Sequence, residues 1–145
     1  MATTQFELVT PNRTLYSGQA EMIVGRTVDG EIAFLANHMP YIGALDAGLV
    51  RIVGPVPEGG GESSGASEIR LAVLGGFVEV KDNQVIMLAD QAELASEIDV
   101  EAARRELAEA EQRVSSAGEG NDPEADTSLR WAQARVEAAV GEPVH

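Results

Sequence analysis

Apolar and polar side chains alternate with a period of two through most of residues 1–90. This alternation predicts β-strands that bury one face and expose the other. Turn-forming residues such as Pro11 and Gly30 interrupt the pattern at short intervals. It therefore predicts short strands at residues 5–9, 14–17, 19–28, 32–35, 48–54, 69–74, 77–80 and 85–88.

Two short segments indicate how the later strands connect. Gly75-Gly76 separates the strands expected at 69–74 and 77–80, and Asp82-Asn83 is a two-residue link suited to a β-hairpin. The glycine- and serine-rich residues 55–67 have almost nothing to bury, so we expect a surface loop there. Many short strands at close spacing are typical of a β-sandwich or barrel.

The pattern changes after Asp90, where the chain becomes rich in Ala, Glu and Arg and its apolar positions recur every three or four residues. The first stripe is Val100, Ala103, Leu107, Ala110 and Val114, and the second is Leu129, Ala132, Val136 and Ala139 or Val140. Asp99 and Asp126 are the expected N-caps, and residues 115–126 the expected joining loop. The sequence predicts a mainly β plus α protein, with an N-terminal β-sandwich domain (1–90) and a C-terminal antiparallel helical hairpin (91–145).

The expected hairpin has a thin apolar seam, because many of its stripe positions are alanine. Such a seam buries too little apolar surface to repay the ordering of two helices. We therefore expect the hairpin to need the sandwich or another chain, and to be able to detach. Trp131, the sole tryptophan, either stacks on Arg135 or lies on the docking face, and the second is expected.

The charge balance excludes several functional classes. The chain carries 24 acidic against 10 basic side chains, a formal net charge of −14, which disfavours nucleic acid and anionic lipid as partners.

The chain has no cysteine, so thiolate chemistry and disulfides are excluded. No apolar run approaches the roughly 18 residues of a membrane span, and residues 1–10 lack the features of a signal peptide. We expect no direct membrane insertion and no export by that route.

The stretch from Asp29 to Leu45 holds the most suggestive side chains. A turn at Asp29-Gly30 and a break at residues 37–40 are expected to place Glu31 and His38 at two neighbouring corners. An acidic group and an imidazole at such corners fit an acid/base pair, a contact surface for another chain, or solvated turn residues. With only two histidines and no calcium-loop spacing, the sequence predicts no catalytic residue, metal site or cofactor.

Four motifs in order resemble the epsilon subunit of F-type ATP synthase, in its bacterial and chloroplast form. They are Phe6-Glu7-Leu8-Val9-Thr10-Pro11 with Leu15-Tyr16-Ser17-Gly18, Asp29-Gly30-Glu31 through Asn37-His38-Met39-Pro40, Gly75-Gly76-Phe77-Val78-Glu79-Val80, and Ala89-Asp90-Gln91-Ala92-Glu93. The match spans most of the first hundred residues and is followed by the helical pattern. The resemblance implies the same fold, a β-sandwich followed by a helix pair.

The resemblance implies a non-catalytic rotor part that sits beside the gamma subunit and touches the ring of c subunits. Glu31 and His38 occupy the positions that match the family's c-ring contact, whereas the gamma contact residues are not identified. The hairpin of relatives folds against the sandwich or extends along gamma toward the alpha and beta subunits, where it blocks hydrolysis. The implied location is the cytoplasmic face of the bacterial cell membrane, peripheral, with the thylakoid membrane as the alternative.

One departure from the family bears on nucleotide binding. Relatives that bind ATP on the hairpin carry Ile or Leu, Asp, two residues, then Arg-Ala. Here Asp99 is followed at that spacing by Ala102-Ala103, and the arginines are Arg104 and Arg105, displaced by two and three positions. This displacement turns the guanidinium groups by more than half a helical turn, which counts against an ATP site at Asp99, Arg104 and Arg105.

Two other functions stay open at this point. The first is a small acidic β-sandwich that binds a ligand, with the glycine-rich residues 55–67 as its edge; an aromatic-lined pocket would favour it, and aromatics are only 4% of the chain. The second is an enzyme that uses Glu31 and His38, which requires their side chains to converge in a concave site.

Overall fold

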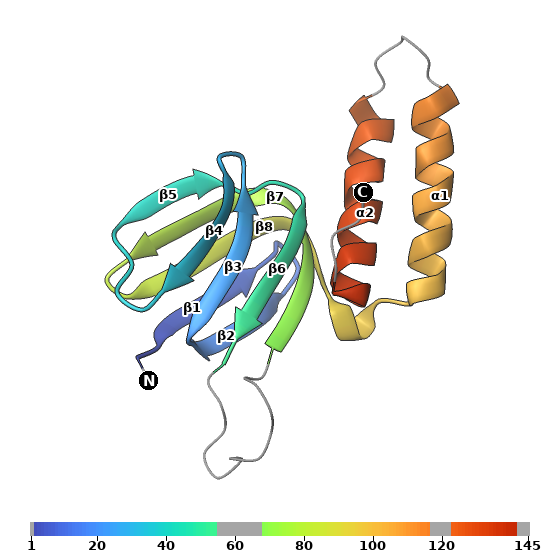
Figure 1. Ribbon diagram of the computed structural model, residues 1–145. Coiled ribbons are helices and arrows are strands. Elements are labelled where there is room, and N and C mark those ends of the chain that lie inside the picture. Colours follow the sequence, from blue (N-terminus) through green and yellow to red (C-terminus); the bar gives the residue numbers. More distant parts are fainter. Residues whose placement is uncertain (1, 55–67, 117–122, 142–145) are drawn as a thin grey trace.

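The computed structural model describes residues 2–54, 68–116 and 123–141. These residues form a β-sandwich with two antiparallel helices standing beside it (Figure 1). The predicted fold class, mainly β plus α, is confirmed. The surface loop predicted at 55–67 lies outside the described residues, as does most of the loop predicted at 115–126.

The strands of the described part follow one another along the sandwich. They are β1 (Thr4–Val9), β2 (Thr14–Ala20), β3 (Met22–Thr27), β4 (Gly30–Leu35), β5 (Tyr41–Ala44), β6 (Gly48–Val53), β7 (Glu68–Lys81) and β8 (Gln84–Leu94). Their order in the sheet is β2-β1-β8-β7-β6-β3-β4, and β5 pairs with β7. The sheet folds over so that β3, β4 and β6 form one layer in front of β1 and β8 (Figure 1).

The core lies between these two layers and follows from the period-two pattern. On β1, for example, Phe6 and Leu8 are fully buried. The largest fully buried side chains are Phe6, Phe34, Leu8, Ile23, Ile52, Leu71 and Met87. Each contributes about 1.5–3 kcal/mol by leaving water, so this cluster is the main source of the sandwich's stability.

The Asp82-Asn83 hairpin turn is confirmed. Both residues have positive φ, 53° and 58°, and they join β7 to β8 with Lys81 opposite Gln84. Positive φ at both central residues defines a type I′ turn, whose twist matches that of the flanking strands. Asp and Asn tolerate this conformation better than most residues, so the local sequence dictates the turn.

The predicted break at Gly75-Gly76 is wrong, because β7 is one strand of 14 residues. Both glycines have positive φ, 70° and 107°, yet β8 keeps one register on either side of them. The first half of β7 pairs with β6 and the second half with β5. The glycines therefore distort the strand where its neighbour changes, and they do not end it.

The strands differ from the prediction in three further respects. The strand expected at 19–28 is divided, since β2 ends at Ala20 and β3 begins at Met22. The four-residue β5 was not predicted at all. Finally, β8 runs on to Leu94, past the predicted strand end at 88 and past the composition change at residue 90. Its last residues pair with β7, so tertiary pairing outweighs their helix-like composition.

The helices are α1 (Val100–Ser116) and α2 (Pro123–Val140), and the short 3-10 helix η1 (Ala95–Glu97) leads into them. Asp99 is confirmed as the cap of α1, because its Oδ1 accepts a hydrogen bond from the Ala102 backbone N–H at 3.2 Å. The predicted cap at Asp126 is wrong: α2 begins at Pro123, a residue suited to a first helical turn, and Asp126 lies inside that turn.

Candidate functional site

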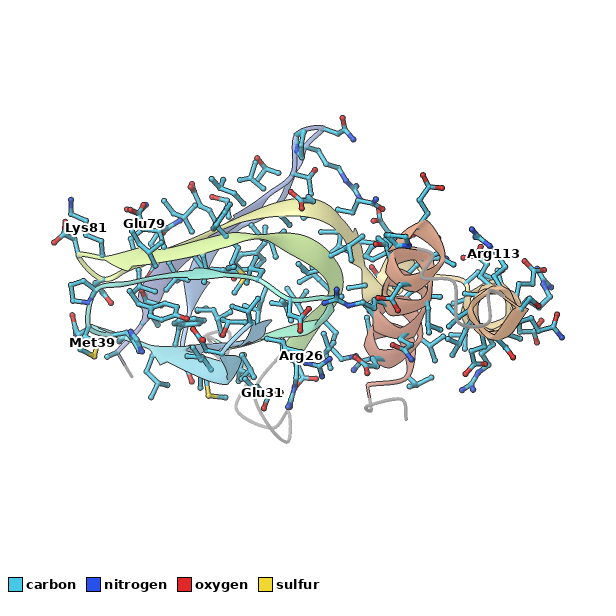
Figure 2. The ribbon with its side chains drawn as sticks, turned by 90° about the horizontal axis from the view of Figure 1, so that it is seen from above. Arg26, Glu31, Met39, Glu79, Lys81 and Arg113 are labelled. Atoms are coloured by element: carbon cyan, nitrogen blue, oxygen red, sulfur yellow. The ribbon has the colours of Figure 1, made fainter. Side chains whose placement is uncertain are left out.

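Glu31 and His38 lie at opposite ends of β4. Glu31 is the second residue of the strand and pairs across from Arg26 of β3, whereas His38 follows the end of β4 by three residues. The stretch from Glu31 to Leu35 alone spans about 13 Å. Figure 2 shows Glu31 beside Arg26, toward the helices, and Met39 at the far end of the sandwich. The hypothesis of neighbouring corners that form an acid/base pair is therefore wrong, and so is the enzyme built on it.

His38 forms part of a small aromatic corner. Its ring meets the ring of Phe34 edge-on at a centroid distance of 5.3 Å, and its Nδ1 lies 2.8 Å from the backbone oxygen of Met39. Met39 and Ile42 beside it are among the most exposed apolar residues of the described chain. This end of the sandwich offers an apolar contact surface around one imidazole.

An apolar stripe crosses the outer face of the sheet. Cross-strand pairing aligns Val9 of β1 with Leu88 of β8, Leu88 with Phe77 of β7, and Phe77 with Ala44 of β5. Phe77 and Leu88 are 61% and 56% exposed. We call Val9, Leu88, Phe77 and Ala44 the outer apolar stripe. Large exposed apolar side chains in adjacent register indicate a surface that another protein covers.

The surroundings of the outer apolar stripe add detail. Pro11 and Asp90 help to line a hollow of about 340 Å³ over the stripe. In the next row of the same face, Glu7 and Glu79 both pair with Ile86 of β8. A partner that fits this surface has an apolar ridge flanked by basic side chains. The sequence analysis missed the stripe, although Phe77 and Leu88 occupy positions of the alternating pattern that face outward.

The three residues named for a nucleotide site lie at the start of α1. The carboxylate of Asp99 is engaged as the α1 cap, and Arg104 and Arg105 are exposed on α1. An ATP site at Asp99, Arg104 and Arg105 stays a prediction.

The helices meet the sandwich through α2, which lies between the sandwich and α1 in both views (Figures 1 and 2). Ala72 of β7 and Leu49 of β6 belong to the same packed cluster as Ala134 and Ala138 of α2. Ala134 and Ala138 are almost completely buried, which shows that the contact is close. The centre of this dock is thus built from small apolar side chains.

Arginine contacts surround the centre of the dock. Arg135 of α2 donates from Nε to Oε1 of Glu93 on β8 at 2.8 Å, and Arg130 of α2 pairs with Asp46. From the sandwich side, Arg26 lies 3.9 Å from the carboxylate of Glu137 on α2. Arg70 donates from Nε to the backbone oxygen of Ala138 at 2.8 Å, where a helix C-terminus favours a cation.

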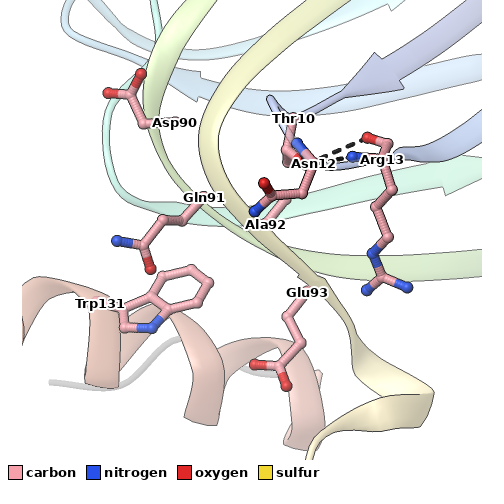
Figure 3. Close-up of a pocket in the computed structure, with 8 residues that line it drawn as sticks. All are labelled: Thr10, Asn12, Arg13, Asp90, Gln91, Ala92, Glu93 and Trp131. Carbon is pink, nitrogen blue, oxygen red and sulfur yellow. Dashed lines mark hydrogen bonds between the residues drawn. The ribbon is translucent and has the colours of Figure 1, made fainter.

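Trp131 lies at the seam between α2 and the sandwich. It lines a cavity of about 500 Å³ whose other walls come from the β1–β2 turn and β8, namely Thr10, Asn12, Arg13, Asp90, Gln91, Ala92 and Glu93. Figure 3 shows Trp131 on the α2 side and Gln91 on the β8 side of this cavity. Trp131 therefore occupies the docking face, as expected. The other residues that line the cavity are polar except for Ala92, so this cavity is not the aromatic-lined pocket that would favour a ligand-binding module.

A further ion pair holds the segment that leads into the hairpin. Arg13 of the β1–β2 turn makes a two-pronged contact with Glu97 of η1, at 2.7 Å and 3.3 Å. Hydrogen bonding to Arg13 lowers the pKa of the Glu97 carboxyl, and the same contact raises the pKa of Arg13. Both side chains are exposed, so the pair is screened by water.

The described residues contain neither a metal-binding cluster nor a helix suited to span a membrane. No group of three or more His, Cys, Asp or Glu side chains in them is placed to hold a metal ion. None of their helices is long and apolar enough to cross a membrane.

Comparison with known families gives a consistent result. Residues 3–95 match the family model for the "ATP synthase, Delta/Epsilon chain, beta-sandwich domain". The ATP synthase epsilon chain of Brevibacillus brevis is 44% identical over 108 residues, 74% of this chain and 75% of the relative. That of Halalkalibacterium halodurans is 38% identical over 141 residues, 96% and 98% of the two chains. The similarity to the second relative thus extends through the helical hairpin.

Solved structures show the same fold. A chain of the mitochondrial ATP synthase of Euglena gracilis, solved with its c-ring, aligns with a TM-score of 0.75 at 24% identity, covering 97% of this chain and 82% of the other. A chain of the Tetrahymena thermophila central stalk and c-ring assembly aligns with a TM-score of 0.56 at 16% identity, covering 94% and 93%.

Proposed function

Because the chain belongs to the ATP synthase epsilon-chain family, we propose that it is a rotor subunit that couples c-ring rotation to the catalytic head through the gamma subunit. It is a non-catalytic subunit, in agreement with the family. The observation that carries the proposal is the outer apolar stripe, which gives the sandwich a contact face of the kind that a stalk partner covers.

The gamma subunit is the partner proposed for the outer apolar stripe. Phe77 and Leu88 supply the large apolar side chains at its centre, and Glu7 and Glu79 supply acidic groups beside them. Large apolar side chains at the centre of an interface carry much of its binding energy, whereas charged groups at the rim guide orientation.

This contact is tested by binding purified chain to gamma. Leu88→Gln removes an exposed leucine from the stripe, and Leu35→Gln is its matched control, because Leu35 is similarly exposed, at 53%, on β4 of the other layer. We expect Leu88→Gln to weaken gamma binding about tenfold, or about 1.4 kcal/mol, and Leu35→Gln to leave it unchanged. Failure of the unaltered chain to bind gamma or an epsilon-depleted catalytic complex would refute the rotor role.

Glu31 and His38 remain the proposed c-ring contacts. The resemblance implies basic polar loops on the ring, which an acidic corner complements. Since the two residues lie at opposite ends of β4, a ring that meets both has to lie along this strand. Charge removal by Glu31→Gln should slow association with isolated c ring at low salt, whereas His38→Gln keeps the acidic group and should act only through the loss of the imidazole ring from the contact. If Glu31→Gln associates with the ring as fast as the unaltered chain does, Glu31 is not part of the contact.

The hairpin is proposed to restrain ATP hydrolysis by leaving the sandwich and reaching toward alpha and beta. The alanine-rich dock supports this, because an alanine buries less apolar area than Leu or Val and so holds the hairpin less strongly. As part of a membrane-associated complex, the chain is proposed to act on the cytoplasmic face of the bacterial cell membrane, with the thylakoid membrane as the alternative.

A further inference from the structure

The surface of α2 that faces the sandwich combines alanines with charged side chains. Arg130, Ala134, Glu137 and Ala138 recur at spacings of three and four residues, so they share one face of the helix. Arg130 and Glu137 contact the sandwich residues Asp46 and Arg26, which orients this face. Its apolar part consists of Ala134 and Ala138, which bury little area compared with Leu or Val, and of Trp131 at the edge of the face.

The seam between the two helices has a different chemistry. Leu107 of α1 and Val136 of α2 are buried in it, together with Ala103, Ala110 and Ala132. Leu129 of α2 packs against the same cluster. Salt does not screen apolar contacts of this kind, whereas it does screen ion pairs. The seam and the dock therefore respond differently to ionic strength.

We infer that the arginine contacts around the dock form an electrostatic clasp, which releases the hairpin from the sandwich as a folded pair of helices when ionic strength rises. We call Arg26, Arg70, Arg130 and Arg135, with their partners, the arginine clasp. Each of these arginines joins α2 to the sandwich, and the Glu137 carboxylate that faces Arg26 is buried between them.

The surfaces that separate mix apolar and charged side chains. Release exposes the buried alanines and Trp131 on α2, beside the charged Arg130 and Glu137. On the sandwich it uncovers Ala72 and Leu49 near the charged Arg70. Separation thus breaks the charged contacts of the clasp, which salt weakens, together with these apolar contacts.

Arg135 allows the clasp to be tested apart from the helix pair. Its Nε contacts Glu93 on the sandwich, and its Nη1 contacts Glu106 on α1. Glu93→Gln therefore removes a contact of the clasp and leaves the contact within the hairpin. Glu106→Gln does the reverse, so the two variants form a matched pair with the same chemical change.

The experiment uses the free full-length chain. Trp131, the sole tryptophan, lies between α2 and the sandwich and reports docking through its emission, and X-ray scattering reports the radius of gyration. Raising KCl from about 0.01 M to about 1 M shortens the screening length from about 30 Å to about 3 Å. We expect a red shift of Trp131 emission and a larger radius of gyration, while far-UV circular dichroism keeps its helical signal.

The variants sharpen this expectation. Glu93→Gln should raise the ratio of undocked to docked chain about threefold at fixed salt and lower the salt midpoint. Glu106→Gln should leave the midpoint where it is. Lys81→Gln should also leave it unchanged, because Lys81 is exposed at the end of the sandwich that lies far from the helices (Figure 2).

Three outcomes would overturn the inference. The first is that salt changes neither the emission of Trp131 nor the radius of gyration. The second is that Glu93→Gln and Glu106→Gln have the same salt midpoint of release. The third is that the helical signal is lost together with docking. The role of the clasp in regulating hydrolysis rests on the proposed function, but the clasp itself is measured without any partner. A failed gamma-binding test and a failed salt test are therefore distinguishable.

Discussion

Gly76 of β7 and Leu88 of β8 approach so closely that a Cβ on Gly76 would lie 1.9 Å from the backbone oxygen of Leu88. The Cα of Ala89 would lie 2.8 Å away as well, so backbone surrounds the position. Gly76 also has a φ of 107°, which L-residues rarely adopt. This contact fixes β7 against β8 directly beside Phe77, and thereby positions the outer apolar stripe.

Gly76→Ala should destabilise the sandwich strongly, because the added methyl group meets backbone that cannot move aside. We expect a loss of about 3 kcal/mol or more in the free energy of unfolding, combining backbone strain with overpacking. Gly30→Ala is the control, since Gly30 has a φ of 122° but no atom within 4 Å of the added Cβ. It should cost only about 1–2 kcal/mol. Urea denaturation measures both, and equal losses would contradict the role of the backbone contact.

The dock predicts a second effect of side-chain size. Ala138 of α2 is fully buried against the sandwich, so Ala138→Leu has no space to occupy. We expect it to weaken docking by about 1–3 kcal/mol, which is typical of overpacking a close contact. Ala108→Leu is the control, because Ala108 is exposed on α1. Trp131 emission at low salt measures docking, and an unchanged spectrum for Ala138→Leu would show that the dock is loose.

The ion pair between Arg13 and Glu97 predicts a dependence of stability on pH. Hydrogen bonding to Arg13 lowers the pKa of Glu97 in the folded chain below its unfolded value. The stability that the pair provides is therefore present above the unfolded pKa and is lost as pH falls through the lower folded pKa. Because both groups are exposed, the contribution is small.

Glu97→Gln isolates this contribution. At neutral pH the variant should be slightly less stable than the unaltered chain, and the difference should vanish in acid, where Glu97 is protonated in both states. Urea denaturation of the two proteins from neutral to acidic pH measures the difference. A difference that grows on acidification would show that the sign of this argument is wrong.

Much of the fold was accessible from sequence because local patterns and tertiary structure agree. The presence of alternating strands in the first ninety residues, the Asp82-Asn83 turn and the Asp99 cap each depend on neighbours in the chain, and each was predicted correctly. The prediction at Gly75-Gly76 was wrong because a pair of glycines usually indicates a turn. Here β7 pairs with β8 on one side and with β5 and β6 on the other, and this long-range pairing continues the strand through the two glycines.

The candidate contact surfaces were less accessible. Local turn signals placed Glu31 and His38 near breaks in the chain, but they did not reveal that β4 separates them. The outer apolar stripe depends on register between β1, β8, β7 and β5, which are distant in sequence. The clasp joins Arg135 to Glu93 across 42 positions, a pairing that helical periodicity does not encode.

Removal of the helices tests their regulatory role. A chain that ends at Asp99 keeps every strand of the described sandwich and the outer apolar stripe, but it lacks α1 and α2. If the hairpin restrains hydrolysis, the shortened chain should assemble with its complex and ATP hydrolysis should rise several-fold, because the blocking segment is gone while the gamma contact remains. Hydrolysis and gamma binding are measured on the same reconstituted complex, with Leu88→Gln as the reference for lost assembly. Unchanged hydrolysis with intact assembly would remove the regulatory role and leave the structural one, since only the hairpin differs between the two complexes.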